Sequence, residues 1–425
     1  MVFSNIDRKS LTGFLIFVFA FELFHIQIND APPMALRMAY IGIYLLFCIM
    51  NIRLIPIFTT VNLIVERFST VYGEFLPNTL YFHIAILFMC YLQLRKNSGS
   101  YLIYYNKTEL TSLIIFGLYA LVSAIFYGIF STVNSILFAL LFMATLTLSH
   151  KEHIKALINC IIITMTISCL FSFINYENLA VQYLTSSGGV QRLAWKDSNY
   201  LSFFIGLVTL LALFKAKHST KRKDINFYLI ITIILLICLT MLISRGAIVA
   251  LAVACAFYYK RQIFSHKIFG YAIVIVIVGY VFYNLGLFDG FIMRFESKDL
   301  ETGSGRTEIW ETGFKTFFGK GNLTILFGAG DNQAANMAYR GGIFYSPHNN
   351  FIEVLFNFGI VGLILFLSWW GSMFFNSKSL EKTALIIFIL TNSMTIVPLS
   401  FVMPVWIIIP LILIWDKYIN KIIYE

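Results

Sequence analysis

The sequence predicts an all-α, polytopic membrane protein with about 12–14 transmembrane helices and one large outer loop. Of the 425 residues, 59% are hydrophobic and only 12% are charged, about half of the roughly 25% charge that is usual in soluble proteins. Apolar runs of about 15–20 residues recur along the chain, as transmembrane helices require. One long polar interval, residues 286–347, interrupts these runs and holds eleven of the 26 glycines.

Fourteen apolar segments are predicted to span the membrane, and together they form a single integral membrane domain over residues 1–425. The third segment is short, so a re-entrant loop is the alternative there. Arg8 and Lys9 precede the first run, but that run is long and no small-residue cleavage site follows, so we expect no cleavable signal. The predicted spans are 11–28, 34–50, 54–66, 79–94, 110–128, 132–148, 156–174, 200–216, 226–243, 246–260, 268–285, 349–371, 383–397 and 400–415.

The basic residues predict the orientation of these spans. With the third segment counted as a span, 20 of the 31 Lys and Arg residues fall on one side, which the positive-inside rule makes cytoplasmic. Without it, the basic connection 95–107 would face outward. Both termini are then expected in the cytoplasm, and the longest outer loops are 175–199 and 286–347. This distribution also explains the net charge of +10, so we expect no nucleic-acid partner.

Arginine is enriched on the predicted outer face. Five of the 20 inner basic residues are Arg, against seven of the 11 outer ones. The planar guanidinium matches phosphate and carboxylate groups, whereas Lys suffices to orient a span. The bias predicts an anionic ligand such as a lipid diphosphate, with Arg side chains snorkelling to headgroups as the alternative. The outer arginines are Arg37, Arg67, Arg192, Arg245, Arg294, Arg306 and Arg340.

A histidine stands where the polar interval meets the next apolar run. Ser346 is a suitable helix cap and Pro347 suits the first helical position, so His348 and Asn349 are expected in the first turn. The helix dipole there disfavours imidazolium, which leaves a neutral His348 able to accept a proton. Asn349, Glu353 and Asn357 then form a polar stripe on one helix face, and such groups normally face a protein interior or a wet cavity. A histidine satisfied at the interface is the alternative.

Three arginines are candidates for binding a diphosphate. Arg245 lies between two predicted spans with almost no loop, Arg192 lies in the other sizeable outer loop, and Arg306 opens a predicted amphipathic helix. Two or three guanidinium groups converging would clamp a diphosphate. The apolar face of that helix is expected to comprise Ile309, Trp310, Phe314, Phe317 and Phe318; packing onto the bundle or the headgroups is favoured for it over sugar stacking.

Asp331, Arg340 and Trp310 are candidate sugar-binding residues. For Asp331 a turn residue is the simpler interpretation. The segment Gly328-Ala329-Gly330-Asp331 resembles half a phosphate loop but lacks the preceding strand and the Gly-Lys-Ser/Thr sequence, so nucleotide binding is rejected. No cluster has metal-ligand spacing, and all six cysteines fall inside predicted spans. We therefore expect no metal, no cofactor and no disulfide.

The sequence resembles the superfamily of O-antigen polymerases and O-antigen ligases, which are bacterial membrane glycosyltransferases. The resemblance rests on residues 303–310 (GSGRTEIW), residues 327–330 (FGAG), Ser244-Arg245, and His348-Asn349 followed after nine residues by Gly359-Ile-Val-Gly362. These motifs lie within residues 240–365, about a third of the chain.

The resemblance implies a metal-independent, GT-C-like enzyme of the bacterial inner membrane, with its active site facing the periplasm and residues 286–347 as a periplasmic loop. Its substrates would be undecaprenyl-diphosphate-linked oligosaccharides, and a chain-length regulator protein is a candidate partner. Carried over by residue, Arg245 and Arg306 would contact the diphosphate, Arg192 would be a further basic residue whose surroundings match less well, and His348 would be catalytic. Asn349 and Glu353, which follow His348 on the polar stripe, are further candidate catalytic residues.

The resemblance leaves polymerase and ligase open. The stretch 304–310 and the 43 phenylalanines favour a polymerase, which extends a glycan on its lipid carrier. The spacing of His-Asn and Gly-x-x-Gly is also that of ligases, which move the finished glycan to lipid A core. A flippase would need internal repeats and polar residues along a pathway, and neither is found.

Overall fold

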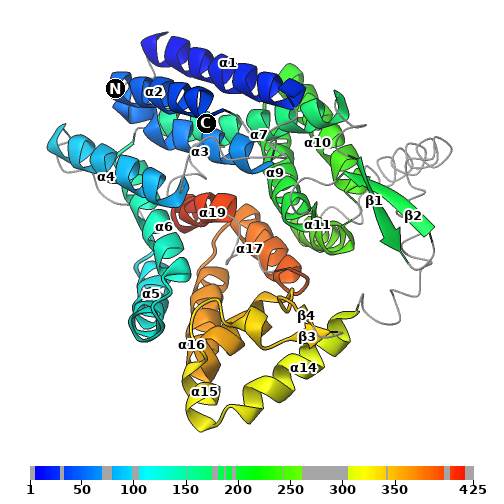
Figure 1. Ribbon diagram of the computed structural model, residues 1–425. Coiled ribbons are helices and arrows are strands. Elements are labelled where there is room, and N and C mark those ends of the chain that lie inside the picture. The colour runs from blue at the N-terminus through cyan, green and yellow to red at the C-terminus, as the bar shows by residue number, and fades with distance from the viewer. Residues whose placement is uncertain are drawn as a thin grey trace.

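The computed structural model describes residues 5–28, 33–68, 79–97, 105–149, 151–174, 180–185, 188–193, 198–242, 244–260, 305–340, 343–396 and 403–416. Helices dominate these residues, so the chain is an all-α polytopic membrane protein (Figure 1). The helices are α1 (Asn5–Ile28), α2 (Met34–Met50), α3 (Ile55–Phe68), α4 (Thr79–Asn97), α5 (Lys107–Tyr127), α6 (Ser131–Thr147), α7 (Lys151–Ile174), α9 (Ser198–His218), α10 (Arg222–Met241), α11 (Arg245–Tyr258), α14 (Arg306–Gly319), α15 (Asn322–Phe327), α16 (Asn350–Phe375), α17 (Leu380–Ser393) and α19 (Met403–Ile414). Two short antiparallel hairpins, β1–β2 (Ala180–Thr185, Gly188–Leu193) and β3–β4 (Tyr339–Arg340, Ile343–Phe344), complete the fold.

Thirteen of the fourteen predicted spans coincide with helices, and the span 268–285 lies outside the described residues. Five described helices are long and apolar enough to cross a membrane: Lys107–Tyr127, Glu152–Phe171, Asn199–His218, Arg222–Met241 and Asn350–Phe375, the last of which is broken at Gly359. Among the described residues, the pair Met34–Met50 and Ile52–Val65, which is bent by 111°, would add a sixth span if it counts as one. This bend is the geometry of a broken span or a re-entrant loop. The re-entrant alternative for 54–66 therefore stands, and the total of 12–14 crossings stays a prediction.

Local capping explains where several helices begin and end. The side chain of Asn106 accepts a hydrogen bond from Thr108 N at the start of α5, which satisfies one of the free amides there. The same helix ends at Gly128, whose φ of 73° is the left-handed conformation that glycine adopts readily. Ser379 caps α17 by accepting from Lys382 N. The connection between α5 and α6 is therefore tight, and the two helices stand side by side (Figure 1).

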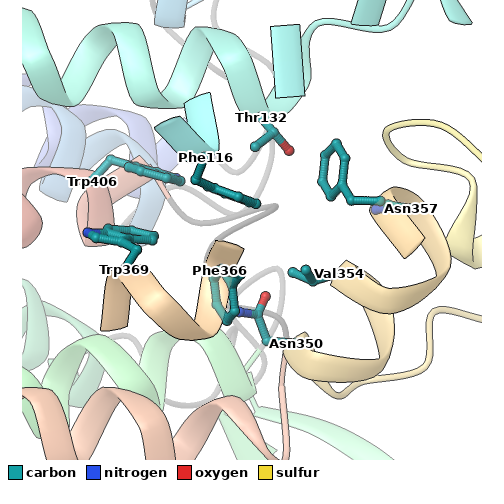
Figure 2. Close-up of a pocket in the computed structure, with 9 residues that line it drawn as sticks. Phe116, Thr132, Asn350, Val354, Asn357, Phe366, Trp369 and Trp406 are labelled. Carbon is teal, nitrogen blue, oxygen red and sulfur yellow. The ribbon is translucent and has the colours of Figure 1, made fainter. Parts of the chain in front are cut away.

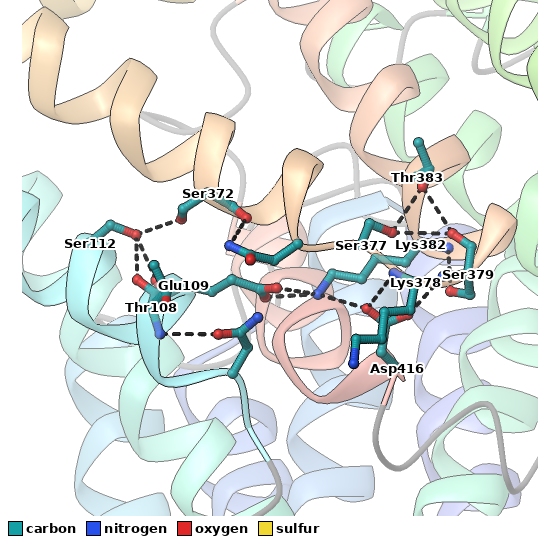
Figure 3. Close-up of polar contacts among 12 residues, drawn as sticks. Thr108, Glu109, Ser112, Ser372, Ser377, Lys378, Ser379, Lys382, Thr383 and Asp416 are labelled. Carbon is teal, nitrogen blue, oxygen red and sulfur yellow. Dashed lines mark hydrogen bonds and ion pairs between the residues drawn. The ribbon is translucent and has the colours of Figure 1, made fainter.

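A buried ionic cluster joins α5, α17 and α19 at the first turn of α17 (Figure 3). Lys382 Nζ lies 2.8 and 2.7 Å from the two carboxylate oxygens of Glu109 and 3.4 Å from Asp416 Oδ2. Asp416 also accepts hydrogen bonds from the backbone amides of Lys378 and Ser379, at 3.0 Å each. Removing one partner of such a pair leaves an uncompensated buried charge. The cluster therefore fixes one end of α17 relative to α5 and α19.

Candidate active site

Helix α16 is broken at Gly359, whose backbone (φ 68°, ψ −171°) is not helical. The rings of Phe351 and Phe366 are 6.1 Å apart, although these residues would lie about 22 Å apart along a straight helix. The halves 350–358 and 360–375 therefore fold toward one another. The predicted span 349–371 is therefore not one continuous helix, because Gly359 provides a left-handed turn within it.

The chain before α16 satisfies the carbonyl groups freed by this break. Within residues 356–358, the carbonyl oxygens accept hydrogen bonds from Ala329 N (3.0 Å), Gly330 N (2.9 Å) and Tyr119 Oη (2.8 Å). A side chain at Gly359 would collide with the carbonyl of Leu326. The amides of residues 329 and 330 are thus used within the protein, which agrees with the rejection of a phosphate loop here.

Asn349 is the N-cap of α16. Its side-chain oxygen accepts hydrogen bonds from Phe351 N (3.0 Å) and Ile352 N (3.2 Å). Ser346 was wrong as the cap and His348 was wrong as a first-turn residue, since the helix begins three residues later than predicted. His348 instead precedes the cap in the left-handed conformation, with φ 48°.

The polar stripe of Asn349, Glu353 and Asn357 faces the protein interior, with 8%, 3% and 2% of these residues exposed. Glu353 Oε2 lies 3.5 Å from Ser346 Oγ, a weak contact across the turn that contains His348. Asn357 Oδ1 accepts a hydrogen bond from Ala334 N at 2.7 Å. The stripe lies in the first half of α16, and Asn357 is two residues before the break.

Helix α14 is held against the residue that precedes His348. The indole Nε1 of Trp310 donates a hydrogen bond to the Pro347 carbonyl at 2.7 Å. Arg306 is the first residue of α14, one turn before Trp310 and on the same face. The first turn of α14 and the turn at His348 are therefore neighbours. The indole N–H of Trp310, a candidate sugar-binding residue, is engaged in this contact, and its predicted role stays a prediction.

The buried face of α14 differs in part from the prediction. Ile309, Gly313 and Phe317 are buried, whereas Phe318 is 55% exposed. The rings of Phe314 and Phe317 pack on Phe356 in the first half of α16, at 5.4 and 5.1 Å. Packing onto the bundle is therefore confirmed for Phe314 and Phe317. Phe318 lies beside them but is exposed, and contact with the headgroups stays a prediction for it.

A single turn after α17 connects Arg245 with His348. Asn349 Nδ2 donates a hydrogen bond to the Met394 carbonyl at 3.2 Å. Gly246 packs so closely on the next residue, Thr395, that any side chain at position 246 would collide with it. Arg245 begins α11 and His348 precedes α16, so the same two-residue segment contacts the residue that follows each of them. Together with Trp310, these contacts bring Arg245, Arg306 and His348 to one region, although they are up to 103 positions apart in the sequence.

Asp331 has a structural partner. Its carboxylate accepts hydrogen bonds from Thr132 N (2.7 Å) and Thr132 Oγ1 (2.9 Å) at the start of α6. Burial raises the pKa of Asp331, and the two Thr132 donors oppose that shift. Asp331 therefore has a structural role: it caps the start of α6, 199 residues earlier in the chain.

Arg192 and Arg340 lie on the two hairpins. Arg192 pairs with Val181 in β1–β2, and Arg340 pairs with Ile343 in β3–β4. Their side chains lie outside the described residues, so their predicted roles stay predictions.

Sequence reasoning missed Asn350, which lines a pocket between the halves of α16 (Figure 2). The adjacent asparagines 349 and 350 were a signal for it.

Comparisons with known proteins cover this same region. Residues 230–367 match the family model described as O-antigen ligase, whereas no curated protein matches the chain. The matched segment contains Arg245, Arg306, His348 and the break at Gly359 and makes up about a third of the chain. Residues 230–367 are therefore similar to the O-antigen ligase family, which confirms over this segment the resemblance seen in the sequence.

Proposed function

We propose that this protein is a surface-polysaccharide polymerase that transfers a growing glycan from undecaprenyl diphosphate to a lipid-linked repeat unit at the periplasmic face of the bacterial inner membrane. The observation that carries the proposal is the shared junction. The Met394–Thr395 turn contacts both the residue after His348 and the residue after Arg245, and Trp310 ties the helix that begins at Arg306 to Pro347. The chain segments that carry a base candidate and two cation candidates are thus tied to one another, which supports the proposal.

The chemistry follows from these roles. A hydroxyl of the acceptor sugar attacks the anomeric carbon of the donor, the bond from that carbon to the diphosphate oxygen breaks, and the diphosphate leaves with the bonding electrons. His348 takes the proton of the attacking hydroxyl. Arg245 and Arg306 stabilise the negative charge that grows on the leaving diphosphate. Cleavage of the sugar–diphosphate bond supplies the free energy for the transfer. The proposed reaction therefore uses no nucleotide and no metal ion.

Glu353 and Asn349 are proposed to act around His348. Glu353 is buried next to the His348 turn, and its carboxylate favours a cationic imidazolium nearby once the proton has moved. Asn349 uses both ends of its amide within the protein. It is therefore proposed as a positioning residue and not, as expected from the sequence, a catalytic one.

A ligase is the second candidate, because the matching family model is described as O-antigen ligase. The stretch at residues 304–310 and the 43 phenylalanines favour a polymerase. The two enzymes differ in the acceptor: a lipid-linked repeat unit for the polymerase, and lipid A core for the ligase.

Deleting the gene in its host and resolving the lipopolysaccharide on a gel tests this choice. A polymerase deletion leaves core carrying a single repeat unit, because ligation continues. Bare core, with long glycan accumulating on the lipid carrier, would mean a ligase instead. Bare core with repeat units retained on the cytoplasmic side would mean a flippase. Unchanged long chains would contradict all three.

A further inference from the structure

A small pocket opens between the two halves of α16 (Figure 2). Helices α5, α6 and α19 complete its wall. The pocket has room for a group about the size of a water molecule. Its apolar lining is Phe116, Val354, Phe358, Phe366, Trp369 and Trp406, and its polar lining is Thr132, Asn350 and Asn357.

Asn350 brings an unsatisfied amide to this pocket. Its side chain is fully buried, and neither Nδ2 nor Oδ1 has a hydrogen-bond partner. In Figure 2 it stands between Val354 and Phe366. The oxygens of the other two polar lining residues are engaged, since Thr132 Oγ1 binds Asp331 and Asn357 Oδ1 accepts from Ala334 N. Buried polar groups are nearly always hydrogen-bonded, so the free amide indicates a missing partner.

The chemistry of the pocket selects that partner. Asn350 offers both a donor and an acceptor, and a hydroxyl group can meet both. The lining contains no charged side chain, so it does not suit a phosphate. An apolar chain would suit the aromatic wall but would leave the amide unpaired, which is unfavourable. A hydroxyl or hydroxymethyl group fits the size, the neutrality and the free amide.

We infer that Asn350 binds one hydroxyl or hydroxymethyl group of the substrate sugar and thereby contributes to sugar specificity. This inference rests on the proposed function, since it assigns a sugar contact two residues beyond His348. Asn350 is also the first residue of α16, directly after the capping Asn349. The amide is thus held by the same helix start that positions His348. A bound water molecule would offer the same hydrogen bonds, so the test must separate water from sugar.

The test measures initial rates of glycan transfer by the purified full chain. Its substrate is the pool of lipid-linked oligosaccharides extracted from a host that lacks the gene. Asn350→Leu keeps the approximate side-chain volume and removes the amide. We expect KM to rise by about tenfold or more, with kcat nearly unchanged, because a ground-state contact is lost. Val354→Leu, which fills the pocket and keeps the amide, is expected to raise KM in the same way.

Thr164→Val is the matched control. Thr164 is fully buried in α7, its hydroxyl has no hydrogen-bond partner, and it does not line the pocket. This variant should keep the wild-type KM and kcat. The melting temperature of Asn350→Leu should be at or above that of the wild type, because an unsatisfied amide has been replaced by an apolar group.

If the wild-type chain transfers glycan in this assay, two results would overturn the inference. Unchanged KM and kcat in Asn350→Leu would mean that the pocket holds only water. A lower kcat and melting temperature with unchanged KM would mean that Asn350 serves packing alone. A wild-type chain that transfers no glycan would instead overturn the proposed function, and the sugar contact with it.

Discussion

His348 adopts a left-handed backbone conformation, with φ 48°, that costs on the order of 1–3 kcal/mol in a non-glycine residue. Such a conformation persists where the surroundings hold it. Here both neighbours are held, Pro347 by the Trp310 indole and Asn349 by the Met394 carbonyl. The position of the histidine is therefore set by contacts from α14 and α17, two elements distant in the sequence.

At the residue scale, the proposed diphosphate clamp predicts that a positive charge at positions 245 and 306 is not enough for full transfer activity. Arg245→Lys and Arg306→Lys should each lower transfer activity by at least about tenfold, because Lys lacks the planar fork of donors. Glycan chain length in complemented deletion strains measures this. Arg222→Lys, at an exposed site at the start of α10, should behave as wild type. Full activity in both test variants would show that no clamp exists.

Residue types alone did not determine where α16 begins or which face of α14 is buried. Ser346 and Asn349 are both good helix caps, and the sequence offered no reason to choose the later one. The choice depends on the Met394 carbonyl, which accepts from Asn349 and comes from a helix predicted independently. Likewise, the exposure of Phe318 depends on the small core around Phe356, which the helical period of α14 alone does not reveal.

At the element scale, the break in α16 separates two roles. The first half carries the polar stripe and packs on α14, while the second half packs on α5 through Phe366 and Trp369. The sequence predicted one continuous span because the apolar run continues through Gly359. A glycine within such a run is equally typical of close helix packing, and only the capping groups at residues 329 and 330 identify it as a break.

Gly359→Ala should therefore be strongly disruptive. A methyl group there meets the Leu326 carbonyl and the Gly328 amide in addition to the unfavourable φ, and should cost at least about 2 kcal/mol. The midpoint of thermal aggregation in detergent measures the loss. The matched change Gly371→Ala lies in the same helix, where a Cβ would be no closer than 3.9 Å to its nearest neighbour. It should be neutral or stabilising. Equal midpoints for the two variants would contradict the role given to the break.

At the scale of the whole molecule, α17 links two different regions. Its first turn enters the buried cluster of Lys382, Glu109 and Asp416, and the turn after its last residue supports Arg245 and His348. The charge pattern predicts the cytoplasm for the first region and the outside for the second. The sequence predicted that the span 383–397 joins these two sides, but it could not predict that one end of this helix enters the ionic cluster and the other contacts the neighbours of Arg245 and His348.

Cysteine labelling tests the predicted sides. Leu323, in α15, is 75% exposed, and Lys221 is exposed before α10. A membrane-impermeant maleimide should label Leu323→Cys in intact spheroplasts and Lys221→Cys only after permeabilisation. Five of the six native cysteines are buried, so background labelling should be low. Labelling of both or neither site in intact cells would contradict the topology.

The central claim is that His348 serves as the base in glycan transfer from a lipid diphosphate, and a transfer assay with purified protein tests it most directly. Wild-type chain and His348→Ala are compared on lipid-linked oligosaccharides from a host lacking the gene, with released undecaprenyl diphosphate as the readout. We predict release by the wild type and a loss of at least about 100-fold in the variant, with an unchanged melting temperature. Release at the wild-type rate by His348→Ala would contradict the account.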